Sequence, residues 1–198
     1  MEKHLTEQES LSLIESMIQR AKNNFSESGT LYLVWGVTIF TCSLFQFIAI
    51  KYYHYSNAFY VWFLTWLVLI YQVIFLVKKH KKLTVRTYTD DILKYVWLCF
   101  TVCTFLMIFI LQSQKPYTSI YPAILVLYAI PTFLSGMVLK VKPLTLGGTC
   151  CWALAVFSVF TAYEYQILFI AAAVLVAWII PGIYLRKKYL KQNSYNGR

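Results

Sequence analysis

The sequence predicts an all-α integral membrane protein, a bundle of six transmembrane helices, and three observations support this fold class. Hydrophobic residues make up 59% of the 198 residues and charged residues 13%, whereas a soluble domain carries about 25% charged residues. Six apolar runs of 17 to 20 residues contain no Asp, Glu, Lys, Arg or His, and about 20 helical residues cross a hydrocarbon core of roughly 30 Å. The runs also lack the period-two alternation of transmembrane strands.

The predicted spans pair into three hairpins and leave no room for a separate soluble domain. The spans are 31–50, 58–77, 95–111, 120–139, 144–162 and 167–185, and the hairpins are 31–77, 95–139 and 144–185. Three regions follow from them: a cytoplasmic amphipathic helix at 1–28, a transmembrane domain at 29–186 and a basic cytoplasmic tail at 187–198. Because the first 28 residues are polar and charged, unlike a signal peptide, the first span is expected to direct its own insertion.

Residues 6–25 predict a helix ahead of the first span. Thr6 and Glu9 form a capping box, and Gly29 is expected to end the helix. Apolar residues recur at spacings of three and four on one helical stripe, namely Leu11, Ile14, Ile18, Ala21 and Phe25. Residues 1–28 hold three basic and five acidic side chains, whereas a lipid-lying helix usually has a basic face. The stripe is therefore predicted to pack on this protein's own cytoplasmic face or to bind a partner or second copy, with lipid as a third alternative.

The positions of the basic residues predict the orientation of the spans. Of the 18 Lys and Arg, 16 lie before the first span, after the sixth or in the second and fourth connections. The other two, Lys51 and Lys115, lie on the opposite side. Because cytoplasmic loops are rich in Lys and Arg, both termini are predicted to be cytoplasmic. The net charge of +10 is mostly this signal, and no nucleic-acid partner is expected.

The spans offer little catalytic chemistry. They contain no acidic, basic or histidine side chain, although such residues mark proton and ion pathways in membranes. His4, His54 and His80 lie outside the spans, and the five cysteines are interpreted as packing residues. No cofactor, metal site or enzymatic activity is therefore expected. Weak polar groups such as Gln46 and Gln72 are expected to bond backbone carbonyls or bridge helices.

Prolines in the fourth and sixth spans predict a hinge. Each removes a backbone donor, so the carbonyls of Leu127 and Ala177 lose their usual partners. Kinks of more than about 20° are expected, around a small recess that opens to the cytoplasm. The alternative is that the kinks only shape the bundle and leave no recess. The candidate residues are Leu127, Pro131, Thr132, Ser135, Gly136, Ala177 and Pro181.

A basic cluster follows the second span and is a candidate contact for anionic lipid headgroups. Its members are Lys78, Lys79, Lys81, Lys82 and Arg86. Anionic lipids attract each such residue by about 1 kcal/mol. The alternative is that the cluster acts only as a determinant of topology.

Two stretches carry a resemblance to a known kind of protein. One is AKNNFSESG at 21–29, followed by Trp35-Gly36. The other is PTFLSG at 131–136, followed by LKVKPL at 139–144, then Gly147-Gly148 and Cys151-Trp152. Together they resemble a family of uncharacterised multi-pass bacterial membrane proteins of this length. The resemblance implies a bacterial inner membrane location, and it implies no activity, cofactor or substrate.

Two functions remain open from the sequence. The first is a non-enzymatic inner-membrane protein that senses or scaffolds, with a cytoplasmic partner contacted through the N-terminal helix. The alternative is a small channel or transporter for a neutral or hydrophobic solute, assembled as an oligomer because six helices enclose little lumen. An intramembrane enzyme is a third and weaker hypothesis.

Overall fold

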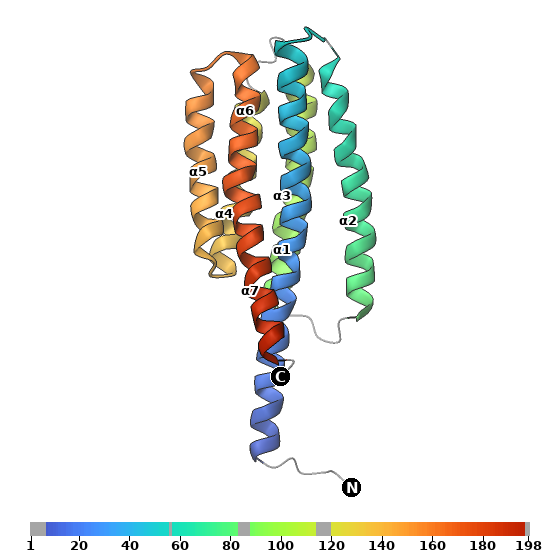
Figure 1. The fold of residues 1–198 in the computed structure, drawn as a ribbon, viewed down its shortest axis with the longest axis vertical. Coiled ribbons are helices and arrows are strands. Elements are labelled where there is room, and N and C mark those ends of the chain that lie inside the picture. The colour runs from blue at the N-terminus through green and yellow to red at the C-terminus, as the bar shows by residue number, and fades with distance from the viewer. Residues whose placement is uncertain (1–6, 56, 83–87, 114–119, 197–198) are drawn as a thin grey trace.

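The protein is a bundle of long helices that run up and down along one axis (Figure 1). The computed structural model describes residues 7–55, 57–82, 88–113 and 120–196, without the side chains of 7–28, 79–82, 88–90, 112, 189 and 191–196. The elements are α1 (Glu7–Lys51), the 3-10 turn η1 (Ala58–Trp62), α2 (Phe63–Lys82), α3 (Tyr88–Ser113), α4 (Ile120–Val138), α5 (Lys142–Val159), α6 (Tyr163–Val174), the π turn η3 (Leu175–Ile179) and α7 (Ile180–Asn196).

This architecture confirms the predicted all-helical class, since no strand occurs in the described ranges. Six stretches are long and apolar enough to cross a membrane: Gly29–Lys51, Ala58–Lys78, Asp91–Leu111, Ile120–Val138, Lys142–Val159 and Tyr163–Lys188. The sixth joins α6, η3 and α7. The start of α1 and the end of α7 lie at the same end of the bundle (Figure 1), as an even number of crossings requires. We call this the lower end.

The core forms around α1 and α4. α1 packs against α6, η3 and α7, while α4 packs against α5, α3 and α6. Fully buried side chains such as Leu125, Leu144, Ile170 and Val174 fill the space between these helices. In contrast, the apolar windows of α2 and α3 contain no buried residue.

α1 differs from the predicted pair of elements. Gly29 does not end a separate helix, because α1 continues through it as one 45-residue helix. The glycine instead allows α7 to approach closely, since a Cβ at Gly29 would lie 2.9 Å from the Cβ of Leu185. Because the helix continues through Gly29, its backbone N–H and C=O groups there keep hydrogen-bond partners that they would lose at a helix end.

The turn between α4 and α5 sets the geometry of that hairpin. Lys140 has a left-handed φ of 54°, its N–H donates to the carbonyl of Met137 at 3.2 Å, and the N–H of Val141 donates to the carbonyl of Gly136 at 2.9 Å. This is a Schellman motif, and the proline at the start of α5 suits the first turn of a helix. The tight turn brings the two helices into direct backbone contact.

Candidate functional site

A groove lies along the side of the bundle between α4, α5 and the start of α6, toward the end opposite the termini, which we call the upper end. We call it the lateral groove. Its volume is about 710 Å³. The wall is apolar and includes Pro122, Ala123, Val126, Ala155, Val156 and Val159. Thr161, Tyr163 and Gln166 add polar atoms near the turn between α5 and α6.

The groove opens above the closest contact between α4 and α5. Lower down, glycines bring the two backbones together: a Cβ at Gly136 would lie 2.4 Å from the backbone nitrogen of Thr145, and one at Gly148 would lie 2.7 Å from that of Phe133. Toward the upper end the facing positions carry side chains, among them Val126 and Val156. The helices therefore cannot approach as closely there, and a hollow remains between them.

Gln166 is a buried polar residue in the lining of the groove. The residue is 3% exposed, and its Nε2 donates to the carbonyl of Thr161 at 3.2 Å. Because the atom facing a carbonyl must be the donor, the orientation of the amide is fixed. Its Oε1 is buried and has no hydrogen-bond partner among the described residues. A buried acceptor without a partner is costly. Because less than 1 Å² of this oxygen is exposed, it does not belong to the open surface of the groove.

A polar network connects the groove to α1. Tyr163, in the groove wall, donates to the hydroxyl of Tyr121 at 3.4 Å. That hydroxyl also accepts from Nε2 of Gln46 at 3.0 Å, and Oε1 of Gln46 accepts from Nε1 of Trp62 at 2.6 Å. The network thus joins α6, α4, α1 and η1, and it confirms that Gln46 bridges helices. Trp35 likewise donates to Gln72, which links α1 to α2.

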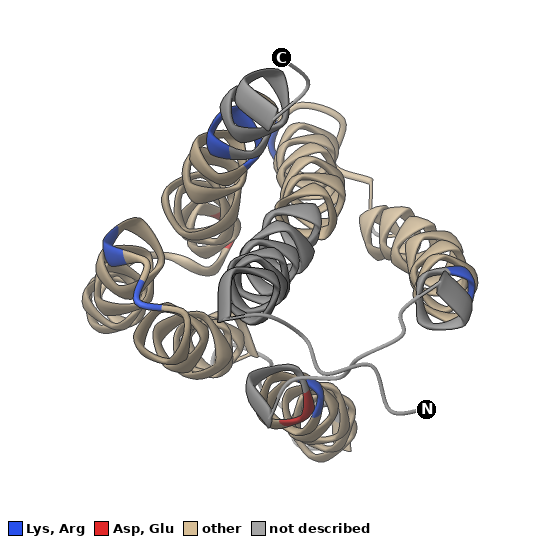
Figure 2. Ribbon diagram, turned by 90° about the horizontal axis from the view of Figure 1, so that it is seen from below, with Lys and Arg blue, Asp and Glu red and all other residues tan. Residues whose placement is uncertain are grey.

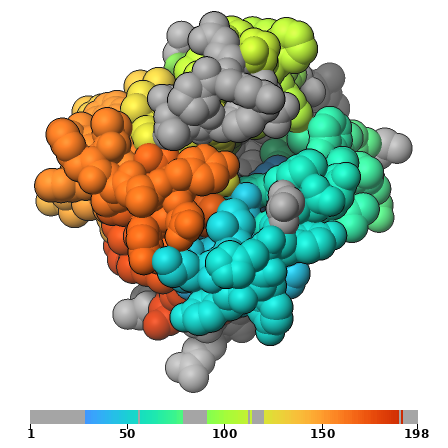
Figure 3. Space-filling view, turned by 90° about the horizontal axis from the view of Figure 1, so that it is seen from above, coloured from blue at the N-terminus to red at the C-terminus, as the bar shows by residue number. Residues whose placement is uncertain are grey.

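The upper end is also joined at its surface. An exposed ion pair connects Nζ of Lys51 to Glu164 at 3.2 Å, and the same ammonium lies 5.1 Å from the ring centre of Tyr165. In Figure 3 the turn between α5 and α6, in orange, lies beside the end of α1 and η1, in cyan. This contact holds α1 and α6 together next to the lateral groove.

One predicted hinge residue of the fourth span, Thr132, contacts the sixth span through Trp178, which the sequence analysis did not name. Nε1 of Trp178 donates to Oγ1 of Thr132 at 2.9 Å, and Thr132 donates to the carbonyl of Tyr128 at 2.7 Å. η3 is a π turn, in which Ile180 donates to the carbonyl of Leu175. The sequence analysis did not predict this turn, although π turns are one source of kinks in helices.

Most of these hinge candidates are packed into the core. Pro131, Thr132, Ser135, Gly136, Ala177 and Pro181 are buried, and Leu127 is half-buried. Gly147 sits so close to η3 that a Cβ there would lie 2.6 Å from the Cα of Ala177. None of these residues lines the lateral groove. A hinge at this position stays a prediction.

Seven of the eight Lys and Arg residues with described side chains lie at the lower end of the bundle, and the eighth, Lys51, lies at the upper end. The seven are Lys78, Lys94, Lys140, Lys142, Arg186, Lys187 and Lys188, which lie near the lower ends of their helices. Figure 2 shows blue Lys and Arg segments at helix ends seen from below. Lys78 is exposed on α2. The side chains of Lys79, Lys81 and Lys82 and the whole of Arg86 lie outside the described residues, so the predicted lipid cluster stays a prediction.

Two further sets of residues from the sequence analysis are the apolar stripe of the N-terminal helix and the cysteines. The side chains of Leu11, Ile14, Ile18, Ala21 and Phe25 lie outside the described residues, although their backbone belongs to α1. The five cysteines are free thiols, with the sulfurs of Cys99 and Cys103 4.0 Å apart on α3. Among the residues that the structure describes, no group of three His, Cys, Asp or Glu side chains could hold a metal.

Gln166 is the site residue that the sequence analysis missed. The predicted sixth span starts one residue after it, whereas α6 begins at Tyr163, which places Gln166 inside the span. Comparison of the chain with protein families, curated proteins and solved structures gives no match. The geometry of the groove and its network therefore carries the argument about function.

Proposed function

We propose that the protein is a non-enzymatic, six-span protein of a bacterial inner membrane with both termini in the cytoplasm. It senses or scaffolds within the membrane and contacts a cytoplasmic protein through the N-terminal part of α1. The bacterial location follows from the resemblance described above, and the remaining points are supported by the features below.

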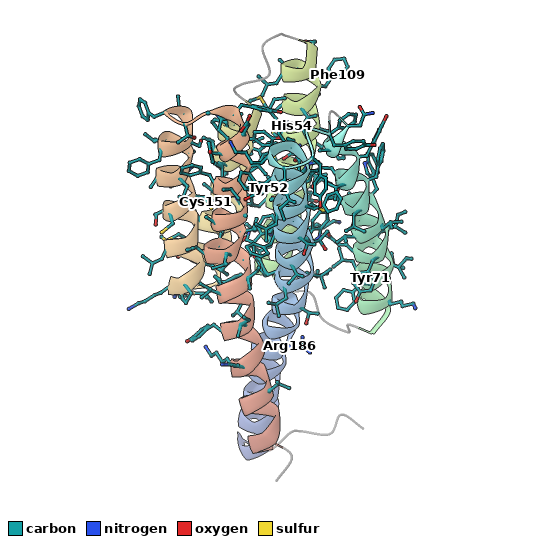
Figure 4. The ribbon with its side chains drawn as sticks, turned by 45° about the horizontal axis from the view of Figure 1, so that its top comes forward. Tyr52, His54, Tyr71, Phe109, Cys151 and Arg186 are labelled. Atoms are coloured by element: carbon teal, nitrogen blue, oxygen red, sulfur yellow. The ribbon has the colours of Figure 1, made fainter. Side chains whose placement is uncertain are left out.

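The outer faces of α2 and α3 support insertion into a bilayer. Phe109 is 74% exposed on α3 and Leu67 is 63% exposed on α2. Figure 4 shows Phe109 on the upper part of α3 and Tyr71 on α2, both at the outside of the bundle. Large apolar patches are costly in water, but a bilayer surrounds them with hydrocarbon. The gathering of described basic residues at the lower end supports a cytoplasmic position for that end.

The continuity of α1 is the observation that carries the proposed role. Its 45 residues correspond to about 68 Å of helix at 1.5 Å per residue, whereas the hydrocarbon core is roughly 30 Å thick. One rigid element therefore reaches from the network around Gln46 at the upper end into the cytoplasmic segment. A shift of α1 against the other spans would therefore move the N-terminal stripe, which belongs to the same helix.

Transport of a neutral or hydrophobic solute is the alternative, and the lining of the lateral groove favours it to some extent. Among the described residues, no charged side chain lines the groove, as a pathway for a neutral solute would need. However, the groove lies on the side of the bundle, which suits binding better than passage along the axis. A flux measurement in liposomes tests this alternative directly.

Substitutions on the stripe test the proposed partner contact. Ile14→Asp with Ile18→Asp should leave membrane integration intact, because the first span carries the insertion signal, but should reduce the size of the complex extracted in mild detergent. Deletion of residues 1–25 should do the same. The matched control is Ser16→Asp with Asn23→Asp, which adds the same charge on the opposite helix face.

The outcomes separate the alternatives for the stripe. If the control pair changes complex size as much as the stripe pair, the effect comes from charge and the partner proposal fails. If the stripe pair lowers the melting temperature of the purified protein without changing the size of the complex, the stripe packs on its own chain. That result also contradicts the proposal.

A further inference from the structure

We infer that α2 is a detachable arm of the bundle, which two tryptophan–glutamine hydrogen bonds latch to α1 and which swings away within the membrane when these bonds open. The inference rests on the proposed membrane insertion. It deepens the proposed sensing role by naming the part of the membrane domain that moves against α1, the helix that continues into the cytoplasmic segment.

Packing holds α2 weakly. The helix stands at the outer edge of the bundle, and its main helix neighbour is α1 (Figure 1). The apolar window of α2 contains no buried residue, whereas 33% of the window of α1 and 50% of that of α4 are buried. Membrane helices associate through close packing rather than through a hydrophobic driving force, because lipid is as apolar as the helix surface. A helix with so little buried surface therefore depends on its hydrogen bonds to stay in place.

Two hydrogen bonds join α2 and the turn that leads into it to α1, and we call them the latches. In the upper latch, Nε1 of Trp62 donates to Oε1 of Gln46 at 2.6 Å. In the lower latch, Nε1 of Trp35 donates to Oε1 of Gln72. Trp62 and Gln72 are ten residues apart, so one latch lies near each end of the arm. Both bonds lie in an apolar zone, where they fix the position of α2 along α1.

The other side-chain contacts of the arm are weaker. The thiol of Cys42 lies 3.6 Å from the carbonyl of Val61, and a thiol is a weak donor. The ring of Trp66 lies 5.6 Å from that of Phe105 on α3, measured between centroids. Neither contact belongs to the core around α1 and α4. Opening of the two latches can therefore release α2 while that core stays intact.

The strength of the latches makes the open form accessible. A hydrogen bond between membrane helices favours the bonded form about threefold on average, so two latches together favour it roughly tenfold. Opening also has an effect on α1, because Gln46 belongs both to the upper latch and to the bond with Tyr121. Movement of α2 thus changes the hydrogen bonding of a residue on the helix that reaches the cytoplasmic segment.

Pulsed electron paramagnetic resonance on the full chain in nanodiscs tests the inference. Non-natural spin-label residues at Ile74 on α2 and Leu146 on α5, both exposed, report the distance between the arm and the bundle. Trp35→Phe and Trp62→Phe each remove an indole N–H and keep an aromatic ring. Each should raise the population at a longer distance about threefold, and the double variant should raise it roughly tenfold.

The matched control is Trp66→Phe, the same substitution on α2 at the tryptophan whose ring contacts Phe105. It should leave the populations unchanged. An equal rise in the control, or no rise in the double latch variant, would overturn the inference. Labels at Leu106 on α3 and Val156 on α5 should keep one distance in every variant, since a change there would mean that the whole bundle loosens, which also contradicts a detachable arm.

Two further outcomes separate this inference from its alternatives. A chain labelled at Ile74 alone that gives a distance would place a second copy against α2, and an arm held in that way is not free to swing. The substitutions on the N-terminal stripe test the partner contact independently. A fixed α2 therefore contradicts this inference and leaves the proposed function standing.

Discussion

At the residue scale, single glycines set the distance between α4 and α5. Gly148 faces the backbone of Phe133, and a Cβ there would lie 2.7 Å from its nitrogen and 2.8 Å from its Cα. Gly136 faces the backbone of Thr145 in the same way. Small residues allow close approach of membrane helices, where van der Waals packing takes the place of a hydrophobic driving force. The atoms of Phe133 and Thr145 closest to these glycines include backbone atoms, which cannot change rotamer to make room as a side chain can.

Gly148→Ala separates two physical effects by their sign. Helix propensity alone would favour alanine by about 1 kcal/mol, whereas the contact with Phe133 should make the variant less stable by about 1–3 kcal/mol through overpacking. We expect destabilisation, measured by unfolding in mixed micelles with increasing SDS. Ala153→Val, on the exposed face of α5, adds methyl groups without a tight contact and should change little. A stabilised Gly148→Ala variant would contradict the packing argument.

At the element scale, α1 and the sixth span show how neighbours decide where a helix bends or continues. Gly29 looks like a stop signal in the sequence, yet α1 continues because α7 packs against that glycine. The sixth span contains a π turn at Leu175–Ile179 just before Pro181. A proline cannot donate to the preceding turn, so the helix changes its hydrogen-bond register close to it.

The continuity of α1 predicts a long and narrow distance. Spin labels at Ser12 and Tyr52, carried by non-natural amino acids because the chain has five cysteines, should lie about 60 Å apart at 1.5 Å per residue. Pulsed electron paramagnetic resonance in nanodiscs measures this distance. Ser28→Pro should shorten and broaden the distribution, whereas Ser28→Ala should not. A broad distribution in the unmodified chain would mean that the helix breaks near Gly29.

At the scale of the whole molecule, charge and hydrophobicity divide the bundle into zones. Most of the described basic residues lie at the lower end (Figure 2), while Lys51 at the upper end is paired with Glu164. Between the ends lie six apolar stretches. The lateral groove belongs to the upper half of this apolar zone, so it faces the leaflet opposite the cytoplasm in the proposed orientation.

Reporter fusions test the orientation of the whole molecule. A fusion after Arg198 and one within residues 81–86 should report the cytoplasm, and one at His54 should report the external side, because Lys and Arg are retained on the cytoplasmic side. An alkaline phosphatase and green fluorescent protein pair gives opposite signals at each point and serves as the control. An external signal at Arg198 would contradict the number of crossings or their direction.

Features that depend on the local chain could be predicted from the sequence. Six apolar stretches and the all-helical class follow from the length and composition of each run, and these properties do not depend on which helix lies next to another. The candidate site could be predicted less completely from the sequence. Thr132 was singled out for its neighbouring proline, and its partner on the sixth span is Trp178, which was not. Gln166 was missed because it precedes the predicted span, whereas α6 begins at Tyr163.

The sequence by itself therefore determined the number of apolar spans and the uneven distribution of basic residues, because hydrophobicity and charge are properties of each segment. Only the tertiary structure decided that α1 continues through Gly29, that the sixth span contains a π turn and that a groove lies beside Gln166. Each of these depends on contacts between helices far apart in the chain, such as Gly29 with Leu185 and Gln46 with Tyr121. The free energy of such contacts comes from shape and hydrogen-bond partners, which no single segment encodes.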